Sequence, residues 1–334
     1  MSDATLARQA ISSRTRTRTR ISSETPNTRK NSMDAATANP NIIGSPELTE
    51  FVFEQAREMK MLPEVAAKAI AIADDPDSSI QELADMISQD LKLATSILSF
   101  ANSPLFPVYA TGKPIGCLKM AVNRLGYRQI KQMILVSSYS ALVGKLSLTE
   151  TEARQNFMKH SFLTACICSE LNKLFKLGIQ GEEFTAGLFH DIGRLLLMTA
   201  VPEQFLAIDK MSFNEDGDLL EQEMAAFGTT HAKLGGWFLR ENALPDELIN
   251  VAIHHHEPSG SARFTRLVAL VAVADSLANS CAANMDAPSE YECVAADSLR
   301  LMELLGAADA TEILSENWAE VLGRAAETCR QILV

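Results

Sequence analysis

The chain has 334 residues, of which 47% are hydrophobic, 22% charged and 6% aromatic. This is the composition of a globular protein, and the length allows one large domain or two smaller ones. The formal net charge of −12 argues against broad nucleic-acid binding, because an acidic surface repels phosphate groups. No apolar run approaches the roughly 20 residues that span a bilayer, so we expect a cytoplasmic protein without a membrane span.

Residues 1–45 differ in composition from the rest of the chain. They are rich in Ser, Thr, Arg and Asn, and the run from Arg14 to Arg20 alternates arginine with threonine. Such a segment buries too little apolar surface to offset the entropy of ordering it, so we expect a disordered basic tail. Three functions stay open for it: a tether to an anionic surface, a nucleic-acid-binding arm, or an organellar transit peptide.

Helical periodicity begins near Ser45 and continues through the first half of the chain. Ser78 or Ser79 is placed to cap one of these helices, and Glu82 lies where the glutamate of a capping box would. Gly and Pro mark the turns between helices, and no alternation suggests a sheet. The predicted helices of this half cover residues 47–59, 64–73, a segment starting after the capping serine, 90–101, 118–125 and 130–142.

The second half is also predicted to be helical. Its expected helices cover residues 152–174, 184–189, 231–241, 246–256 and 267–277, followed by two amphipathic helices within 289–334 that Gly306 separates. Short helices joined by tight turns indicate an all-α, orthogonal multi-helix bundle. We expect residues 46–148 and 149–280 to form two helical subdomains of one domain, with 281–334 as a C-terminal extension packed on the bundle. A homodimer interface is the alternative use of the C-terminal apolar stripes.

Histidines are concentrated in the middle of the chain. All six lie between residues 160 and 256, at His160, His190, His231 and the run His254–His256. Asp191 directly follows His190, and Asp275 lies in an otherwise apolar helical segment, where a carboxylate is costly to bury unless it is paired or metal-bound. Helices that converge on one pocket can supply such side chains to a divalent cation. The sequence therefore predicts a metal site; manganese, iron, zinc and nickel all suit these donors.

Several segments resemble one family. They are 159–161 (Lys-His-Ser), 187–194 (Gly-Leu-Phe-His-Asp-Ile-Gly-Arg), 230–235 (Thr-His-Ala-Lys-Leu-Gly) and 254–258 (His-His-His-Glu-Pro), together with 62–65, 90–93, 101–103 and 121–126 in the first half. This set is similar to the HD superfamily and especially to its HDOD branch, over about residues 55–280. The resemblance implies an all-α fold with a histidine-aspartate core, used as a regulatory output unit in bacterial signalling.

The resemblance also implies roles for individual residues. In active HD phosphohydrolases the matching His160, His190, Asp191 and Asp275 would hold one metal ion. His231 and one or both of His255 and His256 would hold a second, where a second ion is present. Asp191 and Arg194 would be the catalytic residues in an active enzyme.

Two departures separate this sequence from cyclic-dinucleotide phosphodiesterases. Arg194 replaces the lysine of the His-Asp-x-Gly-Lys pattern, and a guanidinium is not interchangeable with an ammonium. Residues 258–263 read Pro-Ser-Gly-Ser-Ala-Arg, without the Asp-Gly-x-Gly-Tyr-Pro loop. Both departures argue against hydrolysis of cyclic di-GMP.

Two functions from different classes therefore stay open. The first is a non-catalytic signalling module with a vestigial metal site, which binds a regulatory protein or a nucleotide ligand. The second is a metal-dependent phosphohydrolase acting on a nucleotide or another phosphodiester. The family resemblance favours the first, whereas the completeness of the His/Asp set favours the second.

Overall fold

A computed structural model of the chain describes residues 44–103, 114–145, 151–211, 219–281, 299–300, 302–303, 306–307 and 309–333. By its internal contacts the chain divides into Met1–Asn41 and Ile42–Val334, and every described residue belongs to the second unit. Of the predicted basic tail, residues 1–43 lie outside the described residues.

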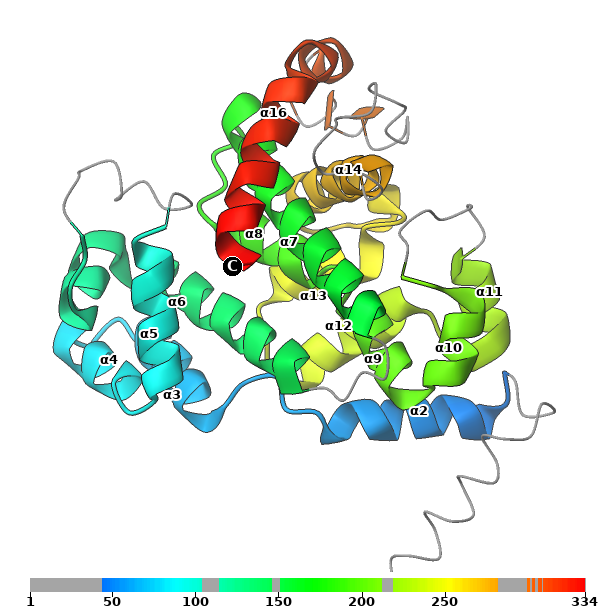
Figure 1. Cartoon of the computed structure of the whole chain (residues 1–334), viewed down its shortest axis with the longest axis horizontal. Coiled ribbons are helices and arrows are strands. Elements are labelled where there is room, and N and C mark those ends of the chain that lie inside the picture. The colour runs from blue at the N-terminus through cyan, green and yellow to red at the C-terminus, as the bar shows by residue number, and fades with distance from the viewer. Residues whose placement is uncertain are drawn as a thin grey trace, which may run out of the picture. The chain divides into compact units, whose positions relative to one another are not determined.

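The described residues are helical and contain no strand, as the periodicity predicts (Figure 1). The principal helices, in chain order, are α2 (Pro46–Glu58), α3 (Glu64–Asp74), α4 (Ile80–Ile87), α5 (Leu91–Ala101), α6 (Leu118–Lys145), α7 (Thr151–Leu174), α8 (Glu182–Phe189), α9 (Ile192–Ala200), α10 (Pro202–Ile208), α11 (Leu219–Phe227), α12 (His231–Glu241), α13 (Asp246–His254), α14 (Thr265–Cys281) and α16 (Ala310–Leu333), with a 3-10 turn, η3, at Pro258–Gly260.

Local signals explain where several helices begin or bend. Ser79 caps α4 by accepting a hydrogen bond from the backbone N–H of Glu82, so the predicted cap is confirmed. Helix α6 covers both segments that were predicted between residues 118 and 142. They are separated at Gly126, which has φ 78° and ψ 164°, a conformation that is accessible to glycine without strain.

Two hydrophobic clusters form the core. The smaller one joins α3, α4 and α5 to the first part of α6, through residues such as Leu83, Ile97 and Ile130. The larger one contains α7 to α9 and α12 to α14. Helix α2 packs against α9, α11 and α12 and contributes Val52 to the larger cluster, because its apolar stripe faces those helices. Helix α2, which lies within residues 46–148, thus packs on helices from the second half of the chain.

Helix α14 is buried on almost every side. From Leu267 to Ala274 every residue is buried. A helix that is apolar all round belongs in a core or in a membrane. None of the helices in the described ranges is long and apolar enough to cross a bilayer. Asp275 follows this stretch directly, so its carboxylate projects from a core helix.

The C-terminal helix α16 packs against α7 and places Trp318, Val321 and Leu322 in the larger cluster. The apolar stripe of the second predicted C-terminal helix is thus buried within the same chain. Most of the first, including residues 289–298, lies outside the described residues.

Helices α9, α10 and α11 are absent from the sequence-based prediction. Helix α9 has only nine residues, and all from Ile192 to Met198 are buried, including the charged Arg194. Such a short segment gives only a weak periodic signal. Helix α10 has only seven residues, which is too short for a periodic signal.

Glycines allow α9 and α12 to approach closely. A Cβ atom added at Gly193 would lie 1.9 Å from the carbonyl oxygen of His231 and 2.9 Å from the backbone nitrogen of Gly235. Both partners are backbone atoms and cannot rotate away. This contact brings the start of α9, which follows Asp191, against the start of α12, which carries His231.

We therefore expect Gly193→Ala to lower the free energy of unfolding by about 3 kcal/mol or more, because the added methyl group must separate two backbones. Gly323→Ala on α16 is the matched control. Among the described residues, no atom outside the local backbone of α16 lies within 4 Å of the position where its Cβ would be, so the change should raise stability by about 0.5–1 kcal/mol. Urea unfolding followed by circular dichroism measures both; equal stability of the two variants would contradict this packing.

Candidate metal centre

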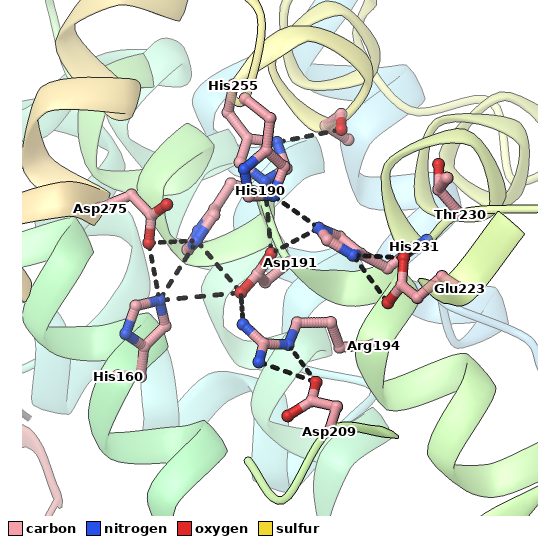
Figure 2. A network of polar contacts seen from close by, with 12 residues as sticks. His160, His190, Asp191, Arg194, Asp209, Glu223, Thr230, His231, His255 and Asp275 are labelled. Carbon is pink, nitrogen blue, oxygen red and sulfur yellow. Dashed lines mark hydrogen bonds and ion pairs between the residues drawn. The ribbon is translucent and has the colours of Figure 1, made fainter. Parts of the chain in front are cut away.

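The structure brings the seven predicted metal ligands together in one cluster. All of them except His256 are labelled in Figure 2. We call this cluster the His/Asp centre; its members are His160, His190, Asp191, His231, His255, His256 and Asp275. They divide into two groups that share Asp191, and within each group the potential ligand atoms lie within 4.8 Å of one another. His254, the remaining histidine of the chain, belongs to neither group.

Five helical segments supply the centre. His160 lies within α7, and Asp275 lies within α14. His190 and Asp191 occupy the junction between α8 and α9. His231 is the first residue of α12, while His255 and His256 directly follow α13. Most ligands therefore lie at helix ends, where the chain turns and a side chain can point between neighbouring helices.

The inner group consists of His160, His190, Asp191 and Asp275, all of which are buried. The Nε2 atoms of His160 and His190 lie 3.1 and 3.3 Å from Asp275 Oδ1. The same two nitrogens lie 3.7 and 3.4 Å from Asp191 Oδ2 and 3.3 Å from each other. Two imidazoles and two carboxylates thus face a common point.

The outer group consists of Asp191, His231, His255 and His256. The Nε2 atoms of His231 and His255 each lie 3.3 Å from Asp191 Oδ1. His231 Nε2 also lies 2.9 Å from His256 Nε2. His256 is exposed, whereas the other three residues are buried.

Asp191 therefore presents one oxygen to each group: Oδ2 faces the inner imidazoles and Oδ1 faces the outer ones. In Figure 2 the Asp191 carboxylate lies between His160 and His231, with dashed contacts to both. A carboxylate placed in this way can bridge two cations.

Three imidazoles are fixed through their other ring nitrogen. His190 Nδ1 donates to the carbonyl oxygen of Gly187 at 2.7 Å. His255 Nδ1 donates to the carbonyls of Val251 and Ala252, both at 3.1 Å. With Nδ1 protonated, Nε2 of each ring is directed at the centre and offers a lone pair to a cation once Nε2 has lost its own proton. This is the arrangement expected of metal-binding histidines.

The third fixed imidazole has a charged partner that the sequence analysis missed. Glu223, on α11, is completely buried, and its carboxylate accepts hydrogen bonds from His231 Nδ1 at 2.8 and 2.9 Å. It also accepts one from the backbone N–H of His231 at 2.8 Å. The only signal in the sequence is a glutamate at an apolar-face position of a short helix, eight residues before a histidine.

Arg194 connects the centre to a second missed carboxylate. Its guanidinium donates to Asp191 Oδ2 at 3.1 Å and to Asp209 Oδ2 at 2.8 Å. Only 2% of the Arg194 side chain is exposed. Arg194 is therefore placed to compensate the negative charge of Asp191 from within the protein core, where solvent does not reach.

The charges of the centre are strongly coupled. Burial opposes the imidazolium form of His190, but the carboxylates of Asp191 and Asp275 outweigh it and raise the pKa of His190 to about 10. Burial likewise favours a protonated Asp191, yet the charges of His190 and Arg194 hold the pKa of this carboxyl well below its usual value. Both directions show that the cluster favours positive charge beside Asp191.

The donors fit a transition-metal cation. Asp191 Oδ1 and His255 Nε2 are both buried and lie 3.3 Å apart, but neither makes a well-aligned hydrogen bond to the described residues. A buried polar atom without a well-aligned hydrogen bond is costly, and a cation between them would satisfy both atoms at once. Neutral imidazoles and carboxylates together are ligands that transition-metal ions prefer.

Comparisons with known proteins agree with this architecture. The HDOD domain family model matches residues 59–258, which is more than half of the chain. An uncharacterized protein of Treponema pallidum is 24% identical over 244 residues; the match covers 70% of this chain and 45% of that protein, so the chain spans less than half of that relative's length.

Solved structures share the fold. An HDOD domain protein of unknown function from Geobacter sulfurreducens superposes with a TM-score of 0.65 at 21% identity, covering 85% of this chain and 99% of its own. A protein from Shewanella amazonensis described as a putative phosphohydrolase has a TM-score of 0.61 at 24% identity, with coverages of 84% and 97%. A Marinobacter aquaeolei protein described as a putative signal transduction protein has a TM-score of 0.60 at 18% identity, with coverages of 83% and 59%. At these identities the likeness concerns the fold alone, whereas the family match covers the sequence motifs themselves: the chain belongs to the HDOD domain family.

Proposed function

We propose that this HDOD protein is a regulatory module of signal transduction whose His/Asp centre binds divalent transition-metal ions. The observation that carries the proposal is the placement of Asp191, with one carboxylate oxygen in each of two groups of oriented imidazoles. A vestigial site would have lost ligands or their supporting hydrogen bonds. Here all seven ligands implied by the family resemblance are present and converge.

The residues of the centre have separate tasks. His160, His190, Asp275 and Asp191 Oδ2 would hold one ion, and Asp191 Oδ1, His231, His255 and His256 would hold another. Glu223 orients His231, and Arg194 balances the charge of Asp191. When bound, such ions supply Lewis acidity toward phosphoryl oxygens and water. Manganese, iron, zinc and nickel are the candidates that the donor set favours.

Two features favour regulation over hydrolysis. The side chains of the inner group are almost fully buried, the most accessible being Asp275 at 11% exposed. Arg194, the nearest cation to Asp191, is engaged by Asp191 and Asp209, so it is not available to bind a substrate phosphate. A structural relative described as a signal transduction protein and the family's use in signalling support the same conclusion.

Metal content tests the proposal. We expect the full chain, purified without chelator and without a polyhistidine tag, to carry up to about two equivalents of transition metal. Asp191→Asn should abolish binding in both groups, because it removes the shared charge while preserving side-chain size. Inductively coupled plasma mass spectrometry, after incubation with Zn²⁺, Mn²⁺ or Fe²⁺, gives the stoichiometry.

His254→Ala is the matched control, because His254 lies in the same histidine run and belongs to neither group. It should retain the wild-type stoichiometry, and circular dichroism should show that all three proteins are folded. Absence of metal from the folded wild-type protein under every loading condition would overturn the proposal.

A second function, metal-dependent phosphohydrolysis, is favoured by the exposure of His256. This residue gives the outer group an edge that a phosphate ester can reach. The structural relative described as a phosphohydrolase supports this candidate.

The second function predicts metal-dependent release of p-nitrophenolate from bis(p-nitrophenyl) phosphate. His256→Ala should lower that rate by more than about tenfold, since changes even behind a metal ligand cost 10–100-fold. His254→Ala should keep the wild-type rate. A metal-loaded protein that leaves the ester intact would exclude this activity toward simple phosphodiesters and leave the regulatory function in place.

A further inference from the structure

The two groups of the His/Asp centre differ in their access to solvent. In the inner group, the side chains of His160 and His190 are 1% and 0% exposed, and that of Asp191 is 2% exposed. In the outer group His231 and His255 are equally buried, but His256 is exposed as a residue, while its ring packs against those of His255 and His231 with centroids 4.1 and 4.9 Å apart. Only the outer group therefore has a ligand that can leave the centre without opening the protein core.

The chain around His256 allows that ligand to move. Helix α13 ends at His254, and the next helical element, η3, begins at Pro258. His256 therefore lies in the short connection between them, whereas the inner ligand His160 lies within the long helix α7 and Asp275 within α14. A side chain on a connection reorients with small backbone changes, while one within a buried helix does not.

The two groups also differ in donor chemistry. The inner group offers two imidazoles and two carboxylates, and the outer group offers three imidazoles and one carboxylate oxygen. Nitrogen-rich sites favour zinc, nickel, cobalt and copper, while magnesium and calcium require oxygen ligands. The outer group therefore suits an imidazole-preferring ion in a four-ligand site.

Part of the outer group is rigid. His231 is held by the buried Glu223 carboxylate, and His255 is held by two backbone carbonyls. Glu223 makes the imidazole of His231 more basic and fixes the ring orientation. Asp191 is held by Arg194. Three ligands are thus fixed before the ion arrives, and the exposed His256 completes the site.

We propose that the outer group is an exchangeable site for an imidazole-preferring divalent ion, whereas the inner group retains its ion. This inference rests on the proposed function, since it requires that the centre bind metal. The occupancy of the outer group then follows the free concentration of the ion, and His256 controls its release. A regulatory module could use this occupancy to sense the free concentration of the ion.

Ion-release kinetics test the proposal. The full chain, loaded with Zn²⁺ and freed of excess ion, is mixed with the chromogenic chelator 4-(2-pyridylazo)resorcinol in a stopped-flow instrument. We expect two separate phases of similar amplitude, a fast one from the outer group and a slow one from the inner group. Prior incubation with Mg²⁺ or Ca²⁺ should displace neither ion.

Variants assign the phases. His256→Ala should lose the fast phase and keep the slow one, while Asp275→Asn should lose the slow phase. Glu223→Gln should weaken zinc binding in the outer group by about 10–100-fold, because it removes the charged partner of His231. His254→Ala should reproduce both wild-type phases. His160→Asn replaces Asp275→Asn if the latter does not fold.

The results separate this inference from the proposed function. Failure of the wild-type protein to bind zinc, manganese or iron overturns both. Two bound ions released in a single phase, or loss of the slow phase in His256→Ala, overturn the exchangeable outer site alone and leave metal binding intact.

Discussion

The structure depends on a buried carboxylate, that of Asp191, at the point where five helical segments meet. Its two oxygens contact imidazoles from α7, α12, the α8–α9 junction and the segment after α13, and Asp275 on α14 contacts the same inner imidazoles. The backbone approach at Gly193 makes this possible, because it lets α9 and α12 lie close enough for Asp191 and His231 to meet. The packing of the core and the contact between Asp191 and His231 therefore both require α9 and α12 to lie close together.

Such a cluster is costly in the absence of compensating charge. An ionised carboxylate in a protein interior is stable only when it is paired, and removing one partner of a buried pair is more damaging than replacing both. Here Asp191, Asp275 and Glu223 are all buried, and Arg194 is itself shared with Asp209. In the proposed function, cations bound between the carboxylates and imidazoles would supply compensating positive charge. That proposal would account for the presence of so many buried ionisable groups in one place.

Much of this arrangement could be predicted from the sequence. His160, His190 and His231 were identifiable because histidines occur only within residues 160–256, and Asp275 because it interrupts an apolar helix. Glu223 and Asp209 were missed because their roles depend on tertiary contacts that no spacing reveals. Helix α9 was missed because its nine residues are too few for a periodic signal to stand out. The unequal exposure of the two groups also required the structure, since adjacent histidines in one run, His255 and His256, are buried and exposed respectively.

Crystallographic location of the ions tests the central claim most directly. An anomalous difference map, collected at the zinc absorption edge from crystals of the zinc-loaded protein, should show two peaks, one on each side of the Asp191 carboxylate. One peak should lie among His160, His190 and Asp275, and the other among His231, His255 and His256. Anomalous peaks only at the protein surface, with no peak beside Asp191, would contradict the account.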